Sequence, residues 1–107
     1  MNIGTTPKHI FTLPFSAEEE VEAVEITYSQ NGKVKLRKTK DDCTITGNDI
    51  IVELSQEDTF NFCETDIIVT TDIIVKIQIR VRLKDGQVLA SDIITCNCQR
   101  CLSHEVL

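Results

Sequence analysis

The stretch IIVKIQIRVRL, residues Ile73–Leu83, decides the fold class. Its odd-numbered positions are all apolar, whereas the even-numbered positions from Lys76 onward carry charged or amide side chains. Successive side chains of a β-strand point to opposite faces, so this pattern predicts a strand with one buried side and one side in water. The rest of the chain has no long segment with apolar residues at helical spacing. We therefore expect an all-β protein.

Turn residues on both sides of this stretch predict hairpins. Asp85-Gly86 follows it and predicts an antiparallel return strand over Val88–Cys96. Earlier in the chain, Asn31-Gly32 separates two alternating segments, Val24–Tyr28 and Val34–Leu36. Because Asn-Gly readily adopts the positive φ angles of a tight turn, these segments are predicted to pair, with the basic outer side chains of the second opposite the acidic side of the first.

A further short hairpin is predicted from Thr44–Thr46 and Ile50–Leu54, which flank a Gly-Asn turn. In the segment 55–59 a Ser is followed three residues later by an Asp, a spacing that caps one short helical turn. We expect Phe60 and Phe62 to pack from this connector into one end of the core.

The number of predicted strands indicates the architecture. The chain has 107 residues, which fits one domain over 1–107. About seven short strands separated by frequent turns are typical of two packed antiparallel sheets. We therefore predict an immunoglobulin-like antiparallel β-sandwich, with a small barrel as the alternative.

One internal repeat complicates the strand boundaries. Thr65–Val69 recurs as Thr71–Val75 at an offset of six residues. An even offset keeps the same side chains facing inward, so either copy fits the same place in a sheet. The extra copy could extend the strand or bulge out as a loop. If Thr65–Val75 is an exposed edge strand, its backbone groups could pair with another chain.

Charge and hydropathy exclude several partners. The formal net charge is -6 and the pI about 4.8, which is the wrong sign for a dedicated nucleic-acid binder. No apolar stretch is long enough to span a bilayer, and the first fifteen residues lack the pattern of a signal peptide. We expect a cytoplasmic protein with neither a nucleic-acid nor a membrane partner.

The cysteines are the sharpest chemical feature. Five are present, at Cys43, Cys63, Cys96, Cys98 and Cys101. Without a secretory signal we expect them to be reduced. The last three lie within six residues, and thiolates suit Zn²⁺, but a closed zinc site needs a fourth ligand from another cysteine, His9, His104 or a carboxylate. We favour structural thiols, with Cys96 and Cys98 on one face of an extended segment, and keep a metal-binding or redox module as the alternative.

Other candidate sites carry less chemistry. His9 and His104 sit near the two ends of the chain in no catalytic motif, and we expect both to be solvated surface residues. The acidic run Glu18–Glu20, with Glu22, is expected to be a solvated charge cluster rather than a cation site. No glycine-rich phosphate-binding motif is present. We assign no catalytic or metal-ligating residue and no cofactor, and leave the binding residues open.

A basic row is expected on one face of the sheet. Its members are Lys76, Arg80 and Arg82, with Lys33, Lys35, Arg37, Lys38 and Lys40 elsewhere. Such a row is most simply a wet sheet face whose charges discourage edge-to-edge aggregation. A surface for an acidic protein partner is the alternative.

Several segments, taken in order, resemble a family of small proteins encoded in prophages of low-GC Gram-positive bacteria, usually alongside tail genes. They are Gly4–Pro7, Phe11–Phe15, Ile26–Gln30, Leu54–Thr59 with Phe62, Gln78–Val81, Ala90–Ile93 and Cys101–Leu107. The chain departs from the family pattern at the Thr65–Val75 duplication and at the Cys96-x-Cys98 pair.

The resemblance implies a role in a phage tail or baseplate, without catalytic residues. Our leading hypothesis is a non-catalytic β-sandwich that binds other tail or baseplate proteins, or itself through an edge strand. It would be in the bacterial cytoplasm during assembly and could stay with the virion. A carbohydrate-binding module ranks last, because the chain has no Trp and a single Tyr to stack on sugars.

Overall fold

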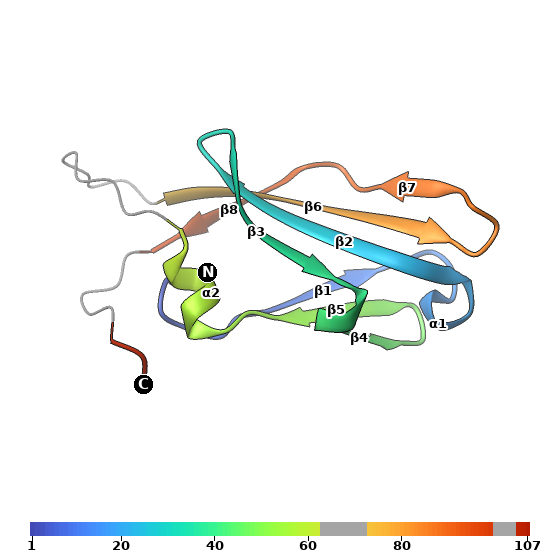
Figure 1. Cartoon of the computed structure of the whole chain (residues 1–107), viewed down its shortest axis with the longest axis horizontal. Helices are drawn as coiled ribbons and strands as arrows, with labels where there is room; N and C mark the ends of the chain where they lie inside the picture. Colours follow the sequence, from blue (N-terminus) through green and yellow to red (C-terminus); the bar gives the residue numbers. More distant parts are fainter. Residues whose placement is uncertain (63–72, 100–104) are drawn as a thin grey trace.

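A computed structural model describes residues 1–62, 73–99 and 105–107. Within them, two antiparallel sheets lie one above the other (Figure 1). The elements in chain order are β1 (Lys8–Thr12), α1 (Ala17–Glu20), β2 (Val21–Gln30), β3 (Lys33–Thr39), the 3-10 turn η1 (Lys40–Asp42), β4 (Cys43–Thr46), β5 (Asp49–Glu53), α2 (Gln56–Phe60), β6 (Ile73–Leu83), β7 (Val88–Ala90) and β8 (Ile94–Cys98). The predicted all-β sandwich is confirmed.

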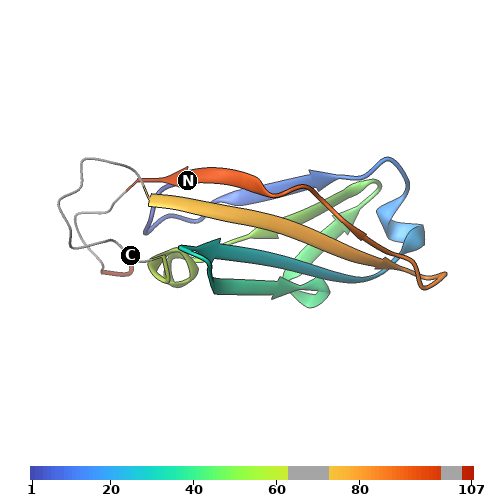
Figure 2. The ribbon, with the colours of Figure 1, turned by 90° about the horizontal axis from the view of Figure 1, so that it is seen from above.

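Strand β6, which has the clearest alternation in the sequence, lies in the middle of the larger sheet. The smaller sheet has the order β1-β5-β4. The larger sheet has the order β3-β2-β6, and the far side of β6 pairs with β7 along one part and with β8 along another. Figure 2 looks onto this larger sheet, with the smaller sheet behind it. The described residues thus form eight strands, where about seven were predicted.

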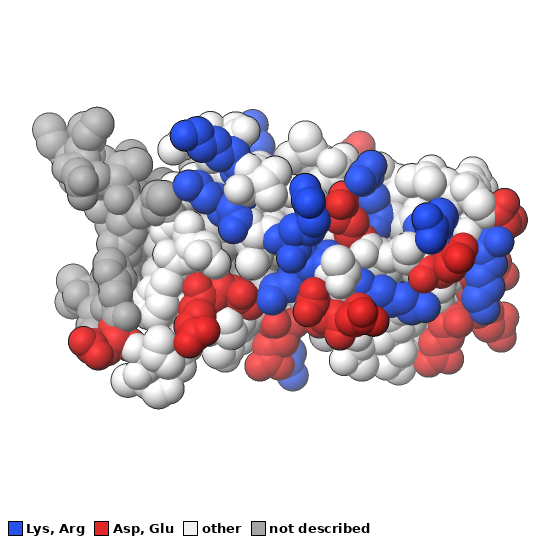
Figure 3. Space-filling view, in the orientation of Figure 1, with Lys and Arg blue, Asp and Glu red and all other residues white. Residues whose placement is uncertain are grey.

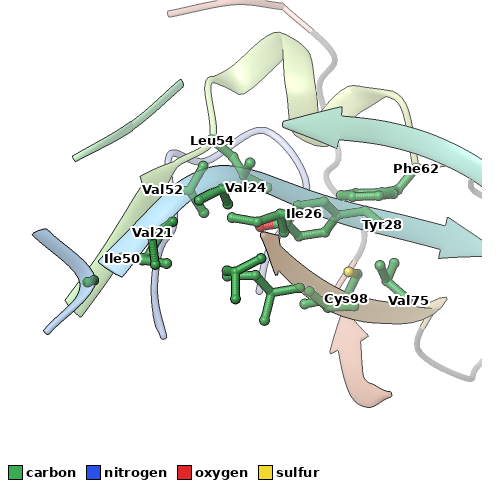
Figure 4. Close-up of a cluster of buried hydrophobic side chains, with 14 of the residues drawn as sticks. Val21, Val24, Ile26, Tyr28, Ile50, Val52, Leu54, Phe62, Val75 and Cys98 are labelled. Atoms are coloured by element: carbon green, nitrogen blue, oxygen red, sulfur yellow. The ribbon is translucent and has the colours of Figure 1, made fainter. Parts of the chain in front are cut away.

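The core is built from the inward faces of β2, β6 and β5. The predicted alternation in β6 is confirmed, because each of its odd-numbered residues is buried. The register pairs Val24 with Val81 and Ile26 with Ile79, so apolar side chains of the two central strands meet on the same face. Figure 4 shows Val24, Ile26 and Tyr28 of β2 in one cluster, with Val52 of β5 near Val24 and Phe62 near Tyr28. Burying an aliphatic side chain of this size stabilises the fold by roughly 1.5–3 kcal/mol.

The hairpin predicted at Asn31-Gly32 joins β2 to β3. Asn31 and Gly32 have φ angles of 54° and 77°, as the tight two-residue turn requires. One detail of the prediction is wrong, because Val34 does not alternate inward and is 53% exposed. A register shift between Tyr28 and Ser29 pairs Val34 with Ser29 on the outer side of the sheet, whereas Leu36 pairs with the buried Tyr28.

The short helical turn predicted after β5 is confirmed. Ser55 accepts a hydrogen bond from the Asp58 backbone N–H at 3.0 Å, and the Asp58 carboxylate accepts one from the Ser55 N–H at 2.9 Å. This reciprocal pair starts α2 at Gln56. Phe62 then enters the core at 1% exposure, and its ring lies 6.1 Å from that of Tyr28.

The predicted return strand over Val88–Cys96 is not continuous, because the structure divides it into β7 and β8. Both halves pair with β6, but Leu89 opposes Val81 whereas Ile94 opposes Ile77, so one extra residue lies between them. The strand therefore breaks at 91–93. There the Ser91 hydroxyl accepts a hydrogen bond from the Ile79 backbone N–H at 3.2 Å.

The first twenty residues contain structure that the sequence pattern did not predict. Strand β1 is an edge of the smaller sheet, and the segment before it, residues 1–3, runs parallel to the chain just after β8 (Figure 2). Helix α1 is a single turn that begins after Ser16, whose hydroxyl accepts the Glu19 N–H at 3.4 Å.

The predicted edge strand near Thr65–Val75 lies mostly outside the described residues. Its described part, Ile73–Val75, belongs to β6 and pairs with Cys96–Cys98 of β8. These three residues are therefore hydrogen-bonded along one side, which does not fit a fully open edge.

Candidate protein-binding face

The outer face of the larger sheet gathers the polar side chains of three strands. We use the name outer face for the solvent side of β3, β2, β6 and β7. Its side chains include Glu25, Thr27 and Ser29 of β2, Arg37 of β3, Lys76, Gln78, Arg80 and Arg82 of β6, and Val88 and Ala90 of β7. The predicted basic row of β6 thus lies on one face, as the alternation requires.

Glu25 is the electrostatic centre of the outer face. Its Oε1 accepts hydrogen bonds from Nη2 and Nε of Arg80 at 2.6 and 3.0 Å. Its Oε2 lies 3.5 Å from Nε of Arg37 on the other neighbouring strand. The predicted pairing of the acidic side of β2 with basic residues of β3 is therefore confirmed for Arg37. The shifted register of β3 on β2 skips Lys35 and pairs Lys33 with a glutamine of β2. One carboxylate fixes two guanidinium groups, which are both more than half exposed.

The outer face carries more positive than negative charge. Arg82 lies 3.6 Å from Glu22, and Lys76 enters none of the ion pairs found among the described residues. The face thus holds four basic side chains against two acidic ones, on a chain whose net charge is -6. Figure 3 shows the same separation from the side, where most basic side chains in view lie over the larger sheet and most acidic ones below it.

Two open hollows flank the Glu25–Arg80 pair. One, of about 290 Å³, lies between Arg80, Arg82 and Val88. The other, of about 280 Å³, is lined by polar side chains together with Lys76 and the 60% exposed Ile93. The pair therefore forms a ridge between two shallow depressions of mixed polarity, a relief suited to protruding side chains of a protein surface.

The cysteine cluster is placed only in part, since Cys63 and Cys101 lie outside the described residues. Cys96 and Cys98 oppose Val75 and Ile73, so both point to the inner side of the sheet, as predicted for structural thiols. Cys98 is fully buried in the core. Cys43 lies in β4, where burial raises the pKa of its thiol and the nearby Asp42 carboxylate adds to this. The described residues contain no group of three potential metal ligands.

The prediction that His9 is a solvated surface residue is wrong. His9 lies in β1 with its ring turned toward the core, and Nδ1 is 2.6 Å from the Tyr28 hydroxyl. Burial lowers the pKa of His9, and the positive charge of the N-terminus lowers it further. No sequence signal marked this contact, because the two residues belong to different sheets. His104 lies outside the described residues.

The acidic run Glu18–Glu20 forms the exposed side of α1, and Glu22 is exposed beside Arg82. All three side chains of the run face solvent, as expected for a solvated cluster. These residues have a local structural role, because acidic side chains in the first turn of a helix interact favourably with the positive end of its dipole.

No family model, curated protein or solved structure matches the chain. The resemblance to prophage proteins therefore stays a prediction. None of the helices in the described ranges is both long and apolar enough to cross a membrane.

Proposed function

We propose that this protein is a non-catalytic binding module of a phage tail or baseplate, and that it docks an acidic protein partner on the outer face. The observation that carries the proposal is the excess of positive charge on this face of an otherwise acidic chain. Opposed potentials steer encounter and select partners by charge.

The geometry around Glu25 supports docking rather than simple solvation. Hydrogen bonds to one carboxylate hold the Arg80 side chain in place while half of its surface stays exposed. A guanidinium held in this way loses less conformational entropy when a partner carboxylate approaches. The face therefore presents preorganised donors on a rigid sheet.

The tail or baseplate context is supported by the resemblance described above, which covers most of the chain. Non-catalytic assembly proteins act through surface complementarity, and an antiparallel sandwich presents broad, stable sheet faces for that purpose. The natural partner in this proposal is another tail or baseplate protein with an acidic surface.

The test is capture from cells that carry the source prophage. The tagged protein is used to retain binding partners from lysates of induced cells, which are then identified by mass spectrometry. Lysates of uninduced cells are the matched control. Enrichment of tail or baseplate proteins only after induction is the expected result. Identical sets of proteins from both lysates would contradict the proposal.

A further inference from the structure

We infer that β7 is a pairing edge for a second copy of this chain, which joins two larger sheets into one continuous sheet around a two-fold axis. This inference rests on the backbone geometry of the edge and does not depend on the partner proposed above.

The first observation is the direction of the β7 backbone groups. Hydrogen bonds join Leu83 to Gln87 and Ser91 to Ile79, so Gln87, Leu89 and Ser91 direct their backbone groups toward β6. Val88 and Ala90 alternate with them and direct their N–H and C=O groups to the open side. Among the described residues, β7 pairs with β6 alone and lies at the margin of the sheet (Figure 1).

The second observation is that β7 lacks the features that usually prevent a sheet edge from pairing with another strand. The run Gln87–Ser91 contains no charged residue and no Pro, in a chain with 26% charged residues. The opposite edge, β3, carries four basic residues, and residues 1–3 cover the chain just after β8. Charges and covering segments are the usual protection of sheet edges, and within the described ranges β7 has neither.

The third observation is an apolar groove next to this edge. It has a volume of about 180 Å³ and lies between Leu13 and Phe15 on one side and Leu89 on the other. Val88 lies on the outer side of the same strand and is 58% exposed. Exposed apolar surface on both sides of an edge strand is typical of an interaction site.

A second copy fits these features because the edge is self-complementary. Antiparallel pairing centred on Leu89 places Val88 opposite Ala90 of the second copy, and the reverse pair follows by symmetry. Each pair forms two backbone hydrogen bonds. The register also brings the two Leu89 side chains together on the inner side, next to both grooves. The uncharged edge lets two acidic chains approach without opposed like charges at the contact.

The inference predicts a monomer–dimer equilibrium that depends on β7. Sedimentation equilibrium of the full chain over a wide concentration range is expected to show the mass rising from one chain to two. Ala90→Pro removes an outward N–H without touching the β6 ladder, and it should weaken dimerisation about tenfold or more.

Two valine substitutions provide a matched comparison. Val88→Lys places a charge on the pairing edge and should likewise weaken dimerisation. Val34→Lys changes a similarly exposed valine on β3 and should leave the dimer intact. A wild-type chain that stays monomeric at all concentrations overturns the inference. Equal dimerisation of Val88→Lys and wild type overturns it as well.

Discussion

The hydroxyl of Tyr28 and Nδ1 of His9 lie 2.6 Å apart, and this hydrogen bond ties the central part of the larger sheet to the edge strand of the smaller one. Burial raises the pKa of Tyr28 and lowers that of His9, so both groups are neutral near pH 7. The contact is part-buried, and its loss leaves a half-buried ring nitrogen without this partner.

Replacing the tyrosine tests this link. Tyr28→Phe keeps the ring beside Phe62 but removes the hydroxyl, and we expect the free energy of unfolding to fall by about 1–3 kcal/mol. Urea unfolding measures the difference. In a His9→Ala background the same substitution should cost clearly less, and an equal cost in both backgrounds would contradict the role of the bond.

Acid should weaken the fold through His9. The folded chain lowers the pKa of this imidazole below its ordinary value of 6.5. Below that pH the unfolded chain therefore binds a proton that the folded chain does not, and stability falls as the pH falls from 6.5 toward the lowered pKa. Urea unfolding at a series of pH values should show this loss. His9→Gln, which keeps His104, should show a smaller loss over the same range.

The two serine caps should differ in their contribution to stability. Ser55 takes part in a reciprocal capping pair at 3.0 and 2.9 Å, whereas the bond accepted by Ser16 is 3.4 Å long. We expect Ser55→Ala to lower the free energy of unfolding by about 1 kcal/mol and Ser16→Ala by less. Thermal or urea unfolding compares them, and an equal or reversed order would count against the described cap geometry.

Core and surface isoleucines provide a direct test of the sandwich. Ile26 is fully buried between the sheets, while Ile10 is 60% exposed on the smaller sheet. Ile26→Ala should cost about 2–5 kcal/mol and Ile10→Ala within about 0.5 kcal/mol. Similar losses for both variants would show that the inward and outward faces are assigned wrongly.

The predictable part of the fold is local in sequence. The strict alternation of Ile73–Leu83, the Asn31-Gly32 turn and the Ser55 cap each depend on residues within one element, and each is found in the structure. The break at 91–93 was not predictable, because a one-residue shift changes pairing without leaving a clear mark on composition.

For the outer face, the sequence predicted which charged residues lie on the same side of the sheet, but not how they contact one another. Alternation placed Lys76, Arg80 and Arg82 on one face, and the hairpin placed Glu25 beside basic residues of β3. The bond between Glu25 and Arg80 joins residues 55 positions apart, so it depends on the pairing of β2 with β6. The contact of His9 with Tyr28 was missed for the same reason, since it requires the packing of one sheet on the other.

The most direct test of the proposed function reverses charge on the outer face. Lys76→Glu with Arg82→Glu changes the charge of that face, and Lys8→Glu with Lys84→Glu changes the net charge equally at other positions. In capture from induced cells, we expect the outer-face variant to lose the tail or baseplate proteins and the second variant to retain them. Equal retention by both variants would contradict docking on the outer face.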